Sequence, residues 1–275
     1  MISAGRNTSW STPITSRANA RVKALRASFR CDASEPGDVL GIEGEQMISE
    51  AVRSGMKLQT LFIREGSVGV VERMCGVAGT EVVVLSGEVF SSAVGTASPK
   101  GIAAMVAVRW PEPCAFSNGA VLILENLQDP GNLGTLIRSA EAFGARRVFL
   151  TKRTVNQWNA KVVRASAGSV FRVPVTRASL EEIAAEVKSL GVVVYAAVAQ
   201  EAGAASVMET AFGKKCGLMI GNEGAGLSAD AIGMAQHRVW IPCAVESLNA
   251  AVAGSTLLYE AMRQRGSLGH AGSRR

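Results

Sequence analysis

A glycine-rich segment, MIGNEGAGLS at residues 219–228, has the spacing of a loop that could hold a small molecule. Gly221 and Gly226 fit the G-x-x-x-x-G frame of a phosphate-binding loop, which continues with Lys and then Ser or Thr. Here Leu227 follows, and the carboxylate of Glu223 lies inside the loop. Backbone N–H groups attract anions, but an uncompensated carboxylate repels them. Phosphate is therefore predicted to be a poor ligand for this loop.

A second candidate segment, ENLQDPGNLGTLIR, continues from a buried-strand pattern at residues 120–127. Its Asp-Pro-Gly-Asn sequence predicts a turn, because Pro130 fixes φ and the next glycine tolerates a positive φ. The helix that follows carries Arg138, a permanently charged group, beside its apolar face. Asn132 is predicted to hold the turn through its side chain, as a cap before Leu133.

A third candidate segment, IPCAVESLNAAVA, joins the last predicted strand to the closing helix. Ser247 is predicted to be the N-cap of that helix, and Asn249 to lie in its first turn. The amide of Asn249 could contact a ligand or order the loop. Each of the three segments follows a predicted strand, which is where parallel α/β sheets form their ligand sites.

Strand and helix patterns alternate through residues 120–265, which predicts an α/β fold: a parallel sheet with helices on both faces. Short apolar runs such as GVVVYAAVA, at residues 191–199, are typical of strands buried in such a sheet. The run VFRVPV, at residues 170–175, is predicted to be another strand. No apolar run approaches the ~18 residues of a membrane span, so a soluble protein is expected.

Changes in pattern and composition predict five parts of the chain. They are a basic N-terminal extension with a helix (1–35), a small α/β domain (36–110), a linker with two prolines (111–119), the larger α/β domain (120–265) and a flexible basic tail (266–275).

The charges of the chain are segregated, although the net charge is only +6. Residues 1–30 carry six Lys or Arg and residues 142–180 carry eight, and neither window contains an acid. Such segregation is typical of a polyanion-binding surface, so nucleic acid is the predicted partner. The first window also fits an organellar transit peptide, but the helical spacing of Val22, Leu25 and Phe29 favours an integral basic helix.

Several other site classes are disfavoured by composition. The five cysteines are scattered without a C-x-x-C pair, which argues against disulfides and zinc and suits a reducing cytoplasm. Two histidines without a suggestive context argue against a Ser-His-Asp site, and no metal site is expected. A dinucleotide-binding oxidoreductase is disfavoured because no G-x-G-x-x-G follows the strand at residues 120–127.

Taken together, the three segments resemble the motifs of the SpoU (TrmH-like) ribose 2′-O-methyltransferases of the SPOUT class. Those motifs read N-x-x-x-x-x-R, G-x-E-G-x-G and I-P-x followed by S-L-N, in the order found here. Residues 41–63 and 97–106 more loosely resemble the ribosomal-protein-like domain that binds substrate in rRNA-modifying members. One departure is Cys243 with the two residues after it, where the family often has Met-x-Gly.

The resemblance implies that the chain binds S-adenosylmethionine in a C-terminal trefoil knot, forms a homodimer and methylates RNA, with 23S-type rRNA favoured by the first domain. A sulfonium donor without phosphate needs no lysine in its loop. The implied cofactor contacts are Ile220, Gly221, Asn222, Ile241, Pro242, Leu248, Asn249 and Ala250. The implied catalytic residues are Arg138, Asn132, Glu223, Ser247 and Asn249.

Physical chemistry assigns expected roles within that set. A guanidinium is a poor base, so Arg138 is expected to grip a phosphate and stabilise charge on the 2′-oxygen. Glu223 is expected to orient Arg138 or Asn132. Trp158 is the aromatic candidate for base stacking. The expected RNA contacts are Arg21, Lys23, Arg26, Arg30, Lys161, Arg164 and Arg172.

Two alternatives remain open from the sequence. A tRNA 2′-O-methyltransferase would carry the same three motifs. A non-catalytic RNA-binding or ribosome-assembly factor would keep the fold, but loss of Arg138 or Asn249 would be expected in it, and both are present.

Overall fold

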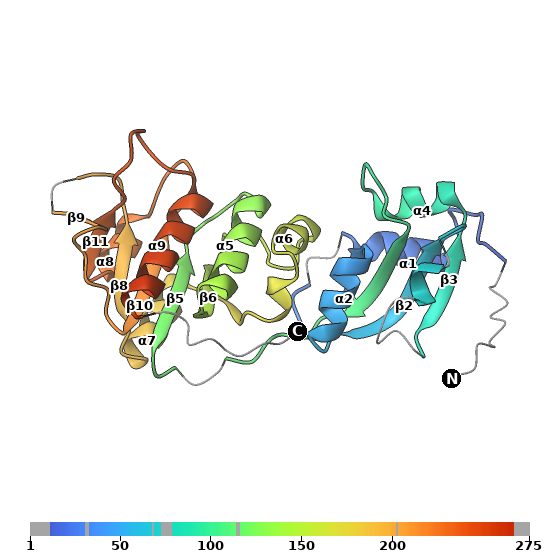
Figure 1. Cartoon of the computed structure of the whole chain (residues 1–275), viewed down its shortest axis with the longest axis horizontal. Helices are drawn as coiled ribbons and strands as arrows, with labels where there is room; N and C mark the ends of the chain where they lie inside the picture. Colours follow the sequence, from blue (N-terminus) through green and yellow to red (C-terminus); the bar gives the residue numbers. More distant parts are fainter. Residues whose placement is uncertain are drawn as a thin grey trace. The chain divides into compact units, whose positions relative to one another are not determined.

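The computed structural model describes residues 12–30, 33–67, 69–72, 79–113, 116–201 and 203–266. The chain forms two compact units that divide between Arg109 and Trp110 (Figure 1). The predicted basic tail, except for Gly266, and the first 11 residues lie outside the described residues. No helix in the described part of the chain is long and apolar enough to cross a membrane.

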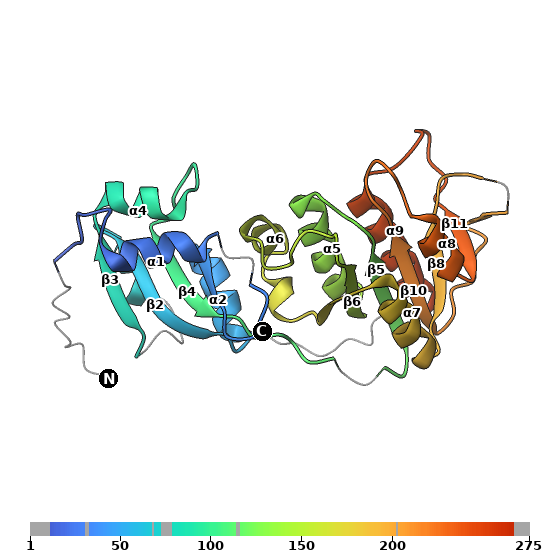
Figure 2. The same cartoon turned by 180° about the vertical axis from the view of Figure 1, so that it is seen from behind.

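The first unit contains a four-stranded mixed sheet in the order β1-β4-β2-β3. Its strands are β1 (Val39–Glu43), β2 (Lys57–Arg64), β3 (Glu81–Leu85) and β4 (Ile102–Ala107), and its helices are α1 (Ala20–Ser28), α2 (Glu45–Arg53), α3 (Gly69–Glu72) and α4 (Gly87–Val94). Helix α2 covers one face of the sheet and α1 the other (Figures 1 and 2). Val22 and Leu25 anchor α1 in the core against Phe90 of α4.

The second unit contains a parallel sheet in the order β7-β6-β5-β10-β8-β11-β9. Its strands are β5 (Gly119–Leu124), β6 (Ala145–Thr151), β7 (Val175–Ala178), β8 (Val193–Ala197), β9 (Ala205–Ser206), β10 (Lys215–Ile220) and β11 (His237–Trp240). Every residue of β5 is buried, as expected for a central strand covered on both faces. The predicted α/β fold class is confirmed.

Helices cover both faces of this sheet. They are α5 (Pro130–Ala142), α6 (Ala160–Ala165), α7 (Leu180–Ser189), α8 (Ala229–Met234) and α9 (Ala250–Gln264), with a 3₁₀ turn at Ser169–Phe171. Alternate residues of β5 point in opposite directions, so Val121 and Ile123 pack with Ile183 and Val187 of α7. Helices α5 and α9 cover the opposite face (Figures 1 and 2).

A glycine brings α5 and α9 into close contact. A Cβ at Gly254 would lie 2.4 Å from Cδ2 of Leu136, so a larger residue would push the helices apart. The hydroxyls of Ser139 and Ser255 lie 2.7 Å apart across the same contact. This packing fixes the helix of the second candidate segment against the helix of the third.

Two predictions within residues 157–175 are wrong. The run at 170–175 is not one strand: a 3₁₀ turn ends at Phe171 and β7 begins at Val175, because Pro174 cannot donate to a ladder. Trp158 is no exposed stacking platform, since only 1% of it is accessible and it stacks on Phe171 with 6.3 Å between centroids. The ring of Trp158 is therefore part of the core, and its buried indole N–H has no hydrogen-bond partner among the described residues.

Candidate active site

Helix α5 begins one turn earlier than the sequence pattern predicts. Its N-cap is Asp129, whose carboxylate accepts a 2.7 Å hydrogen bond from the backbone N–H of Asn132, and Pro130 occupies the first helical position. Asp is a strong N-cap and Pro suits the first turn, so the prediction of Asn132 as the cap is wrong. The amide of Asn132 is thereby left for contacts with other loops.

Helix α9 is capped by Asn249 and not by Ser247, which lies exposed in the preceding loop. The Oδ1 atom of Asn249 accepts hydrogen bonds from the backbone N–H groups of Ala251 and Val252, at 2.9 and 3.2 Å. Asparagine caps a helix as well as serine does, and here its amide nitrogen is left free to donate elsewhere.

A chain of side-chain hydrogen bonds joins the three candidate segments. Asn249 Nδ2 donates to Asn132 Oδ1 at 3.0 Å, and Asn132 Nδ2 donates to Glu223 Oε1, also at 3.0 Å. Asn132 accepts from Asn249 and donates to Glu223, so the hydrogen bonds of this network all run from Asn249 towards Glu223. Three of the five predicted catalytic side chains are thus brought together within one chain.

Glu223 is held as a charged acceptor at the end of this network. Burial acts to raise the pKa of its carboxyl, but hydrogen bonds from Asn132 and from the backbone N–H groups of Gln128 and Asp129 lower it below its ordinary value. The carboxylate therefore stays ionised at neutral pH. That makes Glu223 an orienting group and a weak proton acceptor.

The loop that carries Glu223 is fixed by its own backbone. Asn222 and Gly226 exchange backbone hydrogen bonds at 3.0 and 2.9 Å, and the Asn222 carbonyl oxygen Oδ1 accepts from the N–H groups of Gly224 and Ala225. A Cβ at Gly221 would lie 2.3 Å from the carbonyl carbon of Gly226, so no other residue fits there. Gly221 therefore serves close backbone approach, as predicted, whereas Gly226 supplies a positive φ of 69° and has open space around it.

A buried carboxylate that the sequence analysis missed ties this loop to β5. Glu125 is 4% exposed, and its two carboxylate oxygens accept hydrogen bonds from the hydroxyl and the backbone N–H of Ser228, at 2.6 and 2.8 Å. Ser228 Oγ accepts in turn from Ala231 N–H as the N-cap of α8. Because the Ser228 hydroxyl donates its hydrogen bond to Glu125, its oxygen lone pairs are available to accept from the first turn of α8. The sequence did offer a signal for this role, because Glu125 is a carboxylate directly after the fully buried strand β5.

Glu125→Ala is expected to lower the free energy of unfolding by about 1–3 kcal/mol, because it removes both hydrogen bonds that the buried carboxylate accepts from Ser228. Urea denaturation followed by circular dichroism measures this change. Glu125→Gln keeps an acceptor oxygen and is expected to lose less than half as much. Equal losses for Ala and Gln would show that the pair of hydrogen bonds does not stabilise the loop.

Arg138 does not join the network within one chain. It follows Asn132 by six residues of α5, which corresponds to about 9 Å along the helix axis. Its side chain is exposed, and none of the described residues forms a hydrogen bond or ion pair with it. Gly134, one turn before Arg138, packs against Ala165 of α6, so the arginine lies on the side of α5 nearer to α6.

The predicted cofactor contacts lie where two strands end. Strand β10 ends at Ile220 and β11 at Trp240, and parallel strands end at the same edge of a sheet. Ile241 and Pro242 follow β11 directly, while Leu248 and Ala250 flank the N-cap of α9. This edge offers backbone polar groups and apolar side chains, and no lysine or arginine lies in the loop from Gly221 to Ser228.

Several basic residues proposed for RNA contact already have partners. Arg21 forms an ion pair with Glu81 at 2.6 Å, and Arg172 forms one with Glu141 at 2.5 Å. Arg26 is half-buried and its guanidinium donates to Ser92. Those still exposed without such a partner among the described residues are Lys23, Arg30, Lys161 and Arg164.

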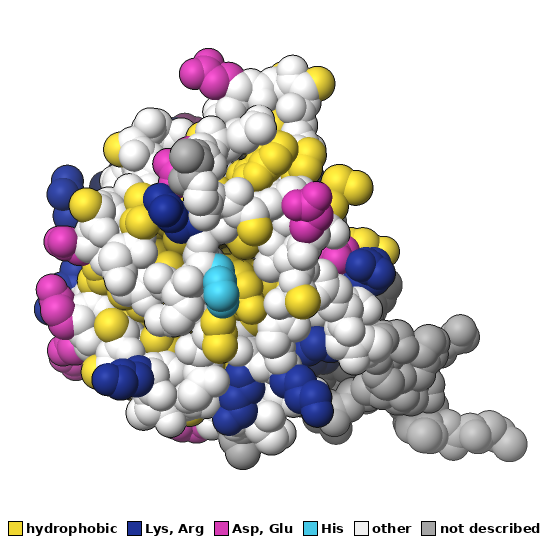
Figure 3. Space-filling model, turned by 90° about the vertical axis from the view of Figure 1, so that its left-hand side faces the viewer, with side chains coloured by type: hydrophobic (Ala, Val, Ile, Leu, Met, Phe, Trp, Pro, Cys, Tyr) yellow, Lys and Arg dark blue, Asp and Glu magenta, His cyan; other side chains and the backbone are white. Residues whose placement is uncertain are grey.

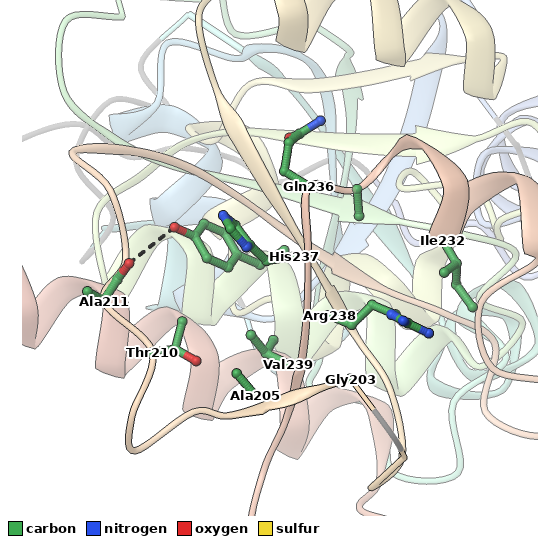
Figure 4. Close-up of a pocket in the computed structure, with 11 residues that line it drawn as sticks. Gly203, Ala205, Thr210, Ala211, Ile232, Gln236, His237, Arg238 and Val239 are labelled. Carbon is green, nitrogen blue, oxygen red and sulfur yellow. Dashed lines mark hydrogen bonds between the residues drawn. The ribbon is translucent and has the colours of Figure 1, made fainter.

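A cavity of about 530 Å³ lies away from this edge, along β8, β11 and β9 (Figure 4). Tyr195 donates a hydrogen bond to the carbonyl of Ala211 beside it, and His237 stacks on the Tyr195 ring. The end of the unit that carries β9 and β11 shows hydrophobic and uncharged side chains over most of its face (Figure 3). Lys and Arg side chains are visible on this face, scattered among hydrophobic and uncharged groups (Figure 3).

Comparison with known proteins decides the family. Residues 119–259 match the model of the SpoU rRNA Methylase family, which covers the β5–α9 region with all three segments. The chain belongs to the SpoU family. Membership confirms the resemblance seen in the sequence and identifies the chain as an RNA methyltransferase. The predicted N-terminal α/β domain precedes the family region, as in relatives that match along nearly their whole length.

Full-length relatives of this SpoU protein are similar in sequence and in structure. The 23S rRNA (guanosine(2553)-2′-O)-methyltransferase RlmP of Bacillus subtilis is 32% identical, with 90% of this chain and 97% of that protein covered. The 23S rRNA (uridine(2479)-2′-O)-methyltransferase of Streptomyces viridochromogenes is 31% identical, with 96% of both covered. An AdoMet-bound rRNA methyltransferase from Sinorhizobium meliloti superposes with a TM-score of 0.77 at 30% identity, covering 92% of this chain and 97% of that one.

Proposed function

We propose that this SpoU protein transfers a methyl group from S-adenosylmethionine to a ribose 2′-hydroxyl of 23S-type rRNA. The observation that carries the proposal is the hydrogen-bonded chain from Asn249 through Asn132 to Glu223 at the carboxyl edge of the sheet. The relatives named for 23S rRNA share both units of the chain, since each covers at least 90% of it. We also propose that the protein acts on this RNA in the cytoplasm.

The residues at this edge fit S-adenosylmethionine. The backbone at Gly221 lies so close to Gly226 that a Cβ at position 221 would collide with it. The loop conformation therefore requires glycine at this position. The cofactor carries a sulfonium cation and no phosphate, which agrees with a loop that holds Glu223 and lacks a lysine. When bound, it supplies an electrophilic methyl group. The backbone of residues 220–222, 241–242 and 248–250 would hold it, threaded as the trefoil knot that the family implies.

The side chains of the network position the substrate ribose. Asn249 Nδ2 and Asn132 Nδ2 each keep a second N–H beyond those used in the network, and either can donate to a ribose oxygen. Glu223 fixes the amide of Asn132 in its donating orientation. The guanidinium of Arg138 can hold a nucleotide phosphate and stabilise the charge that develops on the 2′-oxygen.

A homodimer would bring Arg138 to a site that it does not reach within one chain. Val252 and Tyr259 are 52% and 50% exposed, and their spacing of seven residues puts them on the same side of α9. Tyr259 also contacts Phe143, which ends α5, with their ring centroids 5.7 Å apart. We place the dimer interface on this surface of α5 and α9, whose exposed apolar side chains a second copy would cover.

Transfer of a labelled methyl group from S-adenosylmethionine to RNA tests the proposed function. An unmodified transcript of bacterial 23S rRNA and a pool of unmodified tRNA transcripts serve as parallel substrates. The expected result is label in 23S rRNA at one position, mapped by arrest of reverse transcription at low nucleotide concentration. Label confined to tRNA would favour the tRNA-modifying alternative, and no label in either RNA would favour a non-catalytic RNA-binding protein.

A further inference from the structure

The last residue of β6 and the loop that follows it, residues 151–155, are held in place by the side chain of one arginine. Arg177 of β7 donates hydrogen bonds from Nη1 to the carbonyl oxygens of Thr151, Lys152 and Thr154, at 3.3, 3.1 and 2.6 Å. Its Nη2 donates to the carbonyl of Val155 at 2.8 Å. A guanidinium that donates to four carbonyl groups within five residues fixes the backbone of this segment, and it leaves Arg177 unavailable to RNA.

The same loop is also tied to the active-site segment. Gln128 Nε2 donates to the carbonyl of Arg153 at 2.6 Å, and Val155 N–H donates to the carbonyl of Leu127 at 2.8 Å. The backbone N–H of Gln128 points at Glu223 Oε2, 3.4 Å away. One residue, Gln128, therefore links the carbonyl of Arg153 to the carboxylate at the end of the catalytic network. The loop is a rigid border of the proposed site.

With its carbonyls turned inward, the loop presents two exposed cations, Lys152 and Arg153. They differ in what surrounds them. Hydrogen bonding to the backbone N–H of Ser179 lowers the pKa of Glu182, and the charge of Lys152 adds to that effect, so Lys152 faces an acidic neighbour. The guanidinium of Arg153 forms no hydrogen bond or ion pair within the described part of the chain.

We propose that Arg153 binds a phosphate of the RNA strand next to the target nucleotide. The inference rests on the proposed function. In it, this loop helps to position the RNA backbone at the site. The supporting geometry is an unpaired, exposed guanidinium on a loop that Arg177 stiffens and Gln128 couples to Glu223. A planar guanidinium binds a phosphate through two parallel hydrogen bonds, and a preformed loop loses little entropy on binding.

Charge reversal at the two ends of β6 provides a matched test. Arg153→Glu changes the loop that follows the carboxyl end of β6. Arg146→Glu changes an exposed arginine at the amino end of β6, on the opposite edge of the sheet. Filter binding to the unmodified 23S rRNA transcript without cofactor is expected to weaken about 10-fold for Arg153→Glu. It is expected to change less than about 2-fold for Arg146→Glu.

The dependence on salt separates a local contact from bulk charge. Arg153→Ala is expected to reduce the slope of log K against log salt concentration by about 0.7–0.9, the value for one phosphate contact. S-Adenosylmethionine affinity and melting temperature should stay unchanged in both variants at position 153. Equal weakening by the two charge reversals, or an unaltered salt slope, would overturn the role of Arg153. Failure of the unsubstituted chain to bind S-adenosylmethionine would instead overturn the proposed function, because the RNA measurement needs no cofactor.

Discussion

Replacing Arg138 with alanine is expected to lower kcat for RNA methylation about 10²–10³-fold, the loss typical of removing one group that stabilises developing negative charge. The Kd for S-adenosylmethionine should not change, because the proposed cofactor contacts are the backbone groups of residues 220–222, 241–242 and 248–250. The fold should be unaffected, because the side chain of Arg138 is exposed. Single-turnover methylation of the target RNA, combined with calorimetric titration of the cofactor, measures both quantities.

Arg138→Lys is the matched variant, since it keeps the charge and loses the two-pronged geometry. It is expected to recover only part of the rate. Mixing Arg138→Ala with an inactive variant at Asn132 tests whether the arginine acts across the dimer. Restored activity in the mixture would show that one chain supplies Arg138 and the other supplies the network. A normal rate for Arg138→Ala alone would refute the role of this side chain.

Replacing Asn132 with aspartate is expected to cost at least about 100-fold in kcat. The substitution exchanges a donor for an acceptor and sets a second carboxylate against Glu223, whose Oε1 lies 3.0 Å from the present amide nitrogen. Like charges at this distance repel, so the loop at 222–228 should move away from α5. The change in kcat is measured with saturating cofactor. The displacement of the loop is detected as an increase in the Kd for the cofactor.

The double variant Asn132→Asp with Glu223→Gln reverses the direction of the same hydrogen bond, because the new amide at 223 can donate to the new carboxylate at 132. Partial recovery of activity relative to Asn132→Asp alone is expected. The recovery is incomplete because the backbone N–H of Asp129, 3.3 Å from Oε1, then meets a donor. No recovery at all would mean that Asn132 acts through the ribose and not through Glu223.

The fold class and the family could be predicted because they depend on residue patterns that can be read along the chain. Buried strands such as β5 read as continuous apolar runs, and the order of parallel strands guarantees that their carboxyl ends share an edge. Once Asn132, Glu223 and Asn249 each follow a strand, a common site is a geometric consequence. Their contact at 3.0 Å spacing agrees with that expectation.

What the sequence could not predict depends on choices between neighbouring residues of similar chemistry. Asp129 and Asn132 can both cap α5, and Ser247 and Asn249 can both cap α9, so propensity alone favoured the wrong residue at each helix. The partners of basic residues are equally hidden. Arg177 is as basic in the sequence as Arg153, yet four carbonyl groups hold it beneath a loop.

The identity of the methylated atom shows whether the three loops form a site for ribose methylation. Target RNA methylated by the purified protein with isotope-labelled S-adenosylmethionine is digested to nucleosides, which are separated and identified by mass spectrometry. We expect all label to appear in one 2′-O-methylated nucleoside. The amount of label should be lower for the Asn249→Ala variant and for the Asn132→Asp variant, each tested separately. Label on a base, or equal label from both variants and the unsubstituted chain, would contradict a site built from these three loops.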